Sequence, residues 1–122
     1  MKIKIILVVL LFTAYKSVAQ EFKFESEIIN YGKITQDDSG ERTFKFRNIG
    51  NAPLFIKDIK TSCGCAVPKK PRSPTMPGET GEIIIAYDTT NKGAFSKAIT
   101  VFSNAKTSRK LLKIKGFVII NL

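Results

Sequence analysis

Histidine and tryptophan are both absent from this chain of 122 residues. Without histidine, the chain can build neither a Ser-His-Asp triad nor a Cys-His nucleophile pair, and zinc sites that need imidazole are excluded. Without tryptophan, it lacks the buried Trp that packs on an inter-sheet disulfide in antibody domains. We therefore expect a protein that is not an enzyme and that holds no cofactor.

Long apolar runs are also scarce, and the clearest one lies at the start of the chain. Lys2 and Lys4 precede an unbroken apolar run over residues 5–12, and the small residues Ser17 and Ala19 follow it. This order is typical of an export signal, and the run is much shorter than the ~20 residues that span a bilayer. The pattern predicts a signal peptide over residues 1–19 and a periplasmic or extracellular domain over residues 20–122, with no membrane insertion once the signal is removed.

Acidic residues are half as numerous as basic ones, with 10 Asp and Glu against 20 Lys and Arg. A basic surface attracts anionic partners, although it can also serve only to keep a small β-protein in solution. Nucleic acid is not expected, because the chain has no nucleic-acid motif and is predicted to be exported. The expected partner is a protein or glycan of the cell envelope.

Helical periodicity is missing as well, and short runs of alternating apolar and polar residues take its place. About seven such runs predict an all-β, immunoglobulin-like antiparallel β-sandwich, with a small barrel as the alternative. Near Lys57 and Asp58 the alternation slips by one residue, as at a β-bulge. In the last run Ile120 is expected to point inward. The predicted inter-sheet core consists of Phe44, Phe46, Ile85, Val101 and Ile114.

Prolines are concentrated in one segment, residues 68–81, which contains four of the five. Proline cannot donate to a β-ladder, so the segment is predicted to be a loop or an edge crossing between the sheets. Such a stiff, charged loop is a candidate binding surface, although a plain crossover explains it equally well. The candidate binding residues are Pro68, Lys69, Lys70, Pro71, Arg72 and Met76.

Both cysteines occur in Cys63-Gly64-Cys65. In an extended strand their Cα atoms would lie ~6.5–7 Å apart, at the upper limit for a disulfide, but Gly64 lets the backbone bring them closer. Three interpretations remain open. The pair is a local structural disulfide, a redox site whose thiolate is favoured by Lys60, Lys69 and Lys70, or a Cu(I) site with Met76 as a third ligand.

The acidic residues Asp37, Asp38, Glu41 and Asp88 match no calcium-loop spacing and are interpreted as solvated turns.

Several short motifs follow one another along the chain: Tyr31-Gly32-Lys33-Ile34, Phe44-x-Phe46-x-Asn48-x-Gly50-x-x-Pro53-Leu54, Ser62-Cys63-Gly64-Cys65, Pro77-Gly78-Glu79, Gly93-x-Phe95-x-Lys97, Val101-x-Ser103-Asn104 and Lys115-Gly116-x-Val118. In these motifs the chain resembles the bacterial Domain of Unknown Function 1573 family, secreted proteins common among Bacteroidetes. It departs from the pattern at Ala66, where the family more often has Thr. The resemblance implies an immunoglobulin-like domain of the major sperm protein type, which acts as a binding or scaffolding module.

The sequence thus predicts an exported, non-enzymatic binding or scaffolding module of the envelope. The alternative is a protein that handles thiols or Cu(I) through Cys63 and Cys65.

Overall fold

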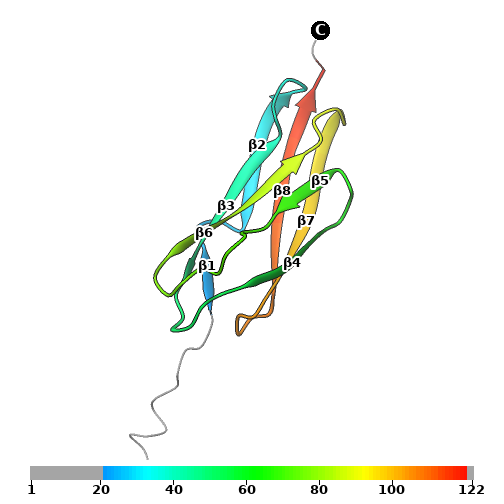
Figure 1. Ribbon diagram of the computed structural model, residues 1–122. Coiled ribbons are helices and arrows are strands. Elements are labelled where there is room, and N and C mark those ends of the chain that lie inside the picture. The colour runs from blue at the N-terminus through cyan, green and yellow to red at the C-terminus, as the bar shows by residue number, and fades with distance from the viewer. Residues whose placement is uncertain (1–20, 121–122) are drawn as a thin grey trace, which may run out of the picture.

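The computed structural model describes residues 21–120 and arranges them as a β-sandwich of two four-stranded sheets (Figure 1). The predicted signal peptide lies outside the described residues. Within residues 21–120, no helix is long and apolar enough to cross a membrane. The strands are β1 (Phe22–Phe24), β2 (Ile28–Thr35), β3 (Glu41–Asn48), β4 (Ile56–Thr61), β5 (Ala66–Lys69), β6 (Thr80–Tyr87), β7 (Gly93–Ser103) and β8 (Arg109–Ile119).

The first sheet has the order β1-β3-β6-β5 and the second has the order β2-β8-β7-β4. Every pair is antiparallel except β2 with β8, which run parallel. The predicted antiparallel sandwich is therefore confirmed, with one parallel pair and with eight strands where about seven were predicted. The exception arises because the chain passes from one sheet to the other between β1 and β2, so that β2 meets the last strand running in the same direction.

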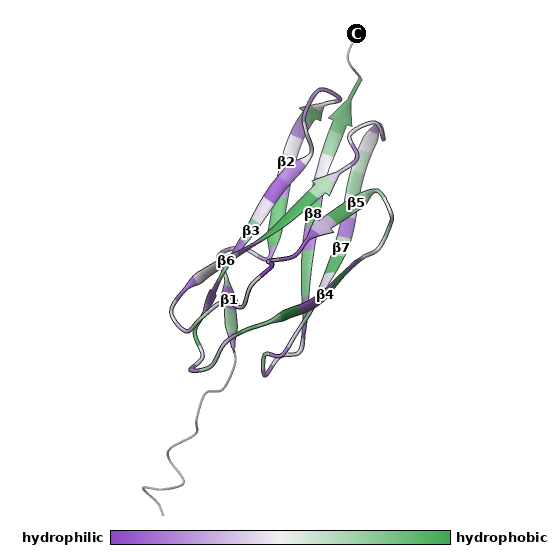
Figure 2. Ribbon diagram, in the orientation of Figure 1, coloured by the Kyte–Doolittle hydropathy of each residue, from purple (hydrophilic) through white to green (hydrophobic). Residues whose placement is uncertain are grey.

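The core lies between the sheets and is apolar, as predicted. Phe44, Phe46, Ile85, Val101 and Ile114 are each at most 1% exposed. Burial of such large side chains stabilises the fold by about 1.5–3 kcal/mol each. The hydropathy of the strands alternates along their length (Figure 2), as a two-layer fold requires. Ile120 was expected inside, but it is 52% exposed because it follows the last paired residue of β8.

Two expectations about irregular backbone had opposite outcomes. The register of β4 shifts between Ile56 and Asp58, which confirms the predicted bulge. Pro68 and Lys69 were predicted to lie in a loop or an edge crossing between the sheets, but they belong to the edge strand β5, where Pro68 pairs with Ile85. A proline is tolerated there because β5 is an edge strand, and its missing N–H faces no neighbour.

One buried polar side chain organises the loops at one end of the sandwich. Asn48, which is fully buried, donates from Nδ2 to Ala52 O and Thr75 O, both at 2.8 Å. Its Oδ1 accepts the Gly50 N–H at 2.9 Å. All of its amide groups are thus used, so that burial of the amide costs little. This explains the Asn-x-Gly spacing noted in the sequence.

Candidate functional site

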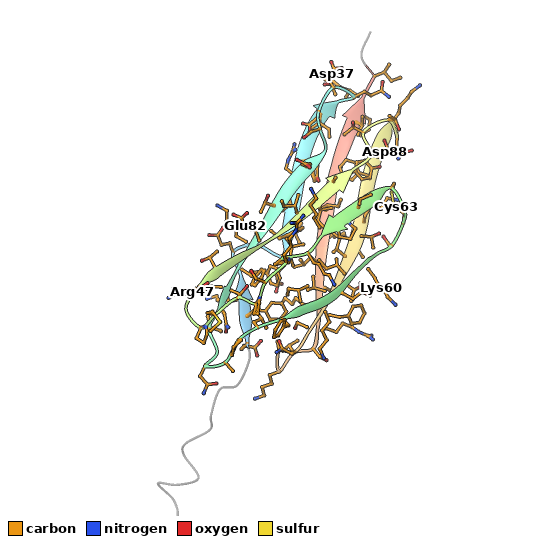
Figure 3. The ribbon with its side chains drawn as sticks, in the orientation of Figure 1. Asp37, Arg47, Lys60, Cys63, Glu82 and Asp88 are labelled. Carbon is orange, nitrogen blue, oxygen red and sulfur yellow. A yellow bond between two sulfur atoms is a disulfide. The ribbon has the colours of Figure 1, made fainter. Side chains whose placement is uncertain are left out.

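Cys63, Gly64 and Cys65 lie in the turn that carries the chain from β4 in one sheet to β5 in the other. Figure 3 shows Cys63 on the same flank of the molecule as Lys60 and Asp88. Both cysteines are partly exposed, and Gly64 is exposed. The turn is therefore reachable from solvent while being attached to both sheets.

The two sulfur atoms form a disulfide, and the Cα atoms of the two cysteines are 5.3 Å apart. That separation falls within the usual range for a disulfide and is shorter than two residues of extended strand would give. The chain leaves β4 at Thr61 and turns at Gly64 before β5 begins. The turn conformation therefore brings the two sulfur atoms within bonding reach.

Hydrogen bonds that involve no sulfur hold the turn in place. The Thr61 hydroxyl contacts Cys63 O at 2.6 Å and Ala66 O at 3.1 Å, so it spans the turn. On the second sheet, Ser62 N donates to Ala98 O at 3.0 Å, and Ala98 N donates to Ser62 Oγ at 3.1 Å. On the first sheet, Asp88 N donates to Cys65 O at 2.7 Å. The backbone of the turn is thus positioned independently of the disulfide.

The surroundings of the two sulfur atoms differ. Cys65 packs against the hydrophobic core, whereas Cys63 is not part of that contact. Cys63 Sγ instead accepts a hydrogen bond from Cys65 N at 3.3 Å.

Two of the three lysines expected beside the cysteines have other partners. Lys60 Nζ lies over the Phe102 ring, 5.8 Å from its centroid, and Lys70 Nζ donates to Lys57 O at 3.1 Å. Lys69 lies in β5 with its side chain exposed. The group that contacts a sulfur atom is the Cys65 N–H, which the sequence analysis did not consider.

The Cu(I) interpretation is not supported by the geometry. Two sulfur atoms that share a covalent bond offer no thiolate to a metal. Met76 lies beside the Thr80 end of β6, because Glu79 N donates to Met76 O, whereas Cys65 is bonded beyond the Tyr87 end. A strand of this length spans roughly 23 Å, so the thioether cannot reach the cysteines. Among residues 21–120, no group of three or more His, Cys, Asp or Glu side chains is arranged to hold a metal.

The candidate binding loop is divided between two structural roles. Pro68 and Lys69 form part of β5, while Lys70, Pro71 and Arg72 line a surface hollow of about 320 Å³ together with Phe55, Ile56 and Ser73. Further along, Thr75 forms a bridge with Leu54. Met76 is exposed beyond it. The segment therefore does not act as one continuous loop.

A polar corner between β2 and β3 was missed by the sequence analysis. Asp38 forms two 3.1 Å hydrogen bonds with the Arg42 guanidinium and accepts Gly40 N at 2.8 Å. These hydrogen bonds, led by the one from Arg42, lower the pKa of Asp38. Arg42 lies over the Tyr31 ring at 4.3 Å, and the Tyr31 hydroxyl donates to Gly40 O at 2.7 Å. Burial raises the pKa of Tyr31 to about 12.

These contacts correct the interpretation of Asp38 as a solvated turn residue. Thr89 joins the corner, since its hydroxyl contacts Gln36 O and Asp38 O at 3.2 and 2.9 Å. The spacing Asp38-x-Gly40-x-Arg42 is the signal that could have revealed the corner, because it places a carboxylate, a turn glycine and a cation together. The corner is internally satisfied and serves the structure.

The outer face of the second sheet carries exposed apolar side chains between cations. On β8 the outward residues alternate, with Leu111 63%, Phe117 44% and Ile119 39% exposed around Lys113 and Lys115. The neighbouring strands and the start of β8 add further cations, and β4 adds a single carboxylate, that of Asp58. We call this surface the basic–apolar face, and it comprises Lys33, Asp58, Lys60, Phe102, Arg109, Leu111, Lys113, Lys115, Phe117 and Ile119.

Solved structures define the class of this fold as an immunoglobulin-like, PapD-like β-sandwich. A protein of unknown function from Porphyromonas gingivalis W83 matches with a TM-score of 0.72 and 18% identity over 87% of this chain and 50% of that one. This chain thus spans half the length of that protein. The PapD-like domain 7 of human CEP192 matches with a TM-score of 0.69 and 8% identity, over 88% of this chain and 92% of that one. The YadV chaperone matches with a TM-score of 0.61 and 14% identity, over 80% and 51%.

The family is shown by the sequence itself. Residues 22–118 match the model of a family described as "Protein of unknown function (DUF1573)". The chain belongs to this family, which confirms the resemblance seen in its motifs. No curated protein matches the chain. The structural matches are too distant in sequence to establish more than the fold, so the function has to be argued from the surface and the turn described above.

Proposed function

We propose that this chain is an exported, non-enzymatic protein-binding module of the cell envelope and that it holds its partner on the basic–apolar face. The observation that carries the proposal is the row of exposed Leu111, Phe117 and Ile119 on β8. Clustered apolar side chains on a water-facing sheet are costly unless a partner covers them. The start of the chain, read as an export signal, supports placement in the envelope.

The edge strands of both sheets are poorly suited to pair with a strand of a partner, so a partner is expected to bind on the face of a sheet. Strand addition needs free backbone donors and acceptors along an edge. In this fold β1 is only three residues long, β2 is interrupted by a bulge, and β5 contains a proline. The remaining edge strand, β4, has Ile59 N bonded to Asp58 Oδ1 and Lys57 O bonded to Lys70 Nζ.

Charge indicates the chemistry of the partner. The cations Lys113 and Lys115 lie in the outward row between Leu111 and Phe117, and Lys60 and Arg109 are held over the Phe102 ring. Against these stands one carboxylate of the same face, Asp58. A protein surface with acidic residues at its centre and apolar residues on either side complements this arrangement, with the charges steering association and the apolar contacts providing the affinity.

The proposal is tested by capture from envelope extract with two matched variants. Leu111→Ser/Phe117→Ser removes two exposed apolar side chains from the basic–apolar face, and Val67→Ser/Ile49→Ser removes two of similar exposure elsewhere. Surface changes of this kind shift stability by only about 0.5 kcal/mol, so both variants should fold.

We expect a protease-sensitive ligand that the wild type and the Val67/Ile49 variant retain and the Leu111/Phe117 variant loses. Added salt should weaken its binding, and the purified ligand should bind with the same pattern. Equal retention by both variants would contradict the assigned face. A ligand that resists protease and is destroyed by glycosidases would contradict a protein partner.

A further inference from the structure

The Cys63–Cys65 disulfide is poorly suited to a stabilising role. It joins residues two apart, so it removes far less freedom from the unfolded chain than a disulfide that closes a long loop. Both sheets are already connected to the turn by hydrogen bonds of Ser62 and Cys65. The bond is also reachable, since both cysteines are partly exposed. Because the disulfide is accessible and adds little to the stability of the fold, it can be reduced without unfolding the domain.

The surroundings of the two sulfur atoms favour different roles in thiol–disulfide exchange. Cys63 lies away from the core and receives the Cys65 N–H at 3.3 Å, which stabilises negative charge on its sulfur. Cys65 packs on the core, which covers one side of it, although both cysteines are partly exposed. The free side of Cys63 favours attack on its sulfur with Cys65 as the leaving group, and the hydrogen bond to Cys63 favours its release as a thiolate in the second step.

The turn should keep this arrangement when the bond opens. Thr61 holds Cys63 O and Ala66 O, and Asp88 holds Cys65 O. None of these hydrogen bonds uses a sulfur atom. The Cys65 N–H therefore stays beside Cys63, and the Cys65 sulfur stays within reach of a mixed disulfide on its neighbour.

We propose that Cys63 and Cys65 carry out thiol–disulfide exchange with a dithiol of a partner protein, with Cys63 as the residue that forms the mixed disulfide and Cys65 as the residue that leaves as a thiolate. A partner thiolate attacks Cys63 Sγ, the bond between Cys63 and Cys65 breaks, and its electron pair leaves on Cys65 Sγ, which takes a proton from water. The partner's second thiolate then attacks its own sulfur in the mixed disulfide and releases Cys63 as a thiolate.

In this sequence the partner dithiol loses two electrons and becomes a disulfide, and the cysteine pair of this chain gains them. One round is stoichiometric with the chain, so the reaction is compatible with a binding module that has no turnover. The inference stands on the turn alone and does not depend on the basic–apolar face.

The decisive experiment compares Cys65→Ser with Cys63→Ser, each as a reduced protein, in reaction with oxidised glutathione at neutral pH. Cys65→Ser keeps Cys63 together with the N–H of residue 65, whereas Cys63→Ser keeps only the sheltered cysteine. Mass spectrometry follows the mixed disulfide with time. We expect Cys65→Ser to react at least fivefold faster, and a ratio below fivefold overturns the assignment.

A second measurement uses the unaltered protein, so that it does not depend on how the variants fold. The oxidised wild type is treated briefly with reduced glutathione and quenched with acid, and the modified cysteine is located by peptide mapping. Glutathione on Cys63 supports the proposal, whereas glutathione on Cys65 or on neither residue overturns it. Binding by Cys63→Ser/Cys65→Ser in the capture assay separates the two proposals, since loss of exchange leaves the basic–apolar face intact.

Discussion

Two turns contact the same end of β6, the end at Tyr87, and the interactions within each turn differ. The corner around Gly40 is held by hydrogen bonds, an ion pair and an aromatic contact, and Tyr87 N donates to Gly40 O at 3.0 Å. The turn around Gly64 contains a covalent bond, and the adjacent Asp88 N donates to Cys65 O. Figure 3 shows Asp88 between the labelled positions of Asp37 and Cys63 along this flank.

The two turns show that a strong covalent bond does not by itself contribute much to the free energy of unfolding. Tyr31, Gly40 and Thr89 of the corner are buried, and the corner joins β2 and β3 to the end of β6, which lies far along the chain. The disulfide ties residues that the chain already keeps close. We therefore expect the fold to depend on the corner without a covalent bond and to tolerate loss of the disulfide.

The largest expected effect comes from filling the corner. A Cβ added at Gly40 would lie 2.0 Å from Tyr87 O, and the residue has φ of 75°. Gly40→Ala should therefore lower the free energy of unfolding by about 3 kcal/mol or more, through overpacking and left-handed strain. Gly32→Ala is the matched control, since it has φ of 68° but nothing within 4 Å, and should cost about 1 kcal/mol. Urea denaturation measures both, and equal losses would contradict the role given to the corner.

A smaller effect should appear in alkali, through Tyr31. Its folded-state pKa is raised to about 12 by burial, so its contribution to stability is complete below pH 10 and is lost as the pH rises from 10 to 12. Between these limits the wild type should lose about 2 kcal/mol more than Tyr31→Phe, which has no phenol to ionise. Unfolding would be measured with both cysteines replaced by serine, so that alkaline cleavage of the disulfide does not contribute. Parallel pH profiles would refute this linkage.

The smallest effect is expected at the disulfide. Cys63→Ser/Cys65→Ser should lower the free energy of unfolding by no more than about 1.5 kcal/mol, because the closed loop is so short. Thermal unfolding followed by circular dichroism, beside the oxidised wild type, provides the measurement. A loss as large as that of Gly40→Ala would reverse the comparison and make the disulfide a structural element.

The sequence was sufficient for the layers of the fold and for most of its core. Alternation identified Phe44, Phe46 and Ile85 as inward, because a strand between two layers must bury alternate residues. The slip near Asp58 was visible as a break in that alternation. These features depend only on residues that are neighbours within one strand. The alternation of apolar and polar residues in the sequence reports such local relations directly.

Features that depend on distant partners were not predictable in the same way. The parallel pairing of β2 with β8 leaves no local trace, and Pro68 is acceptable in a strand only because β5 lies at an edge. Asp38 resembles a solvated turn residue until Arg42 and Tyr31 are placed beside it. Similarly, the Cys63-Gly64-Cys65 motif showed that the sulfur atoms could meet, but not which of them the core would shelter.

The crossing between β1 and β2 also sets the order in which the domain can fold. β2 is an edge strand whose neighbour in its sheet is β8. The backbone of β2 at Ile28 therefore cannot pair until the segment around Lys113 is present. Pairings between such distant segments form slowly, because closing a long loop is unfavourable before any contact compensates for it. While the chain is being synthesised, its second sheet stays incomplete until the last strand has been made.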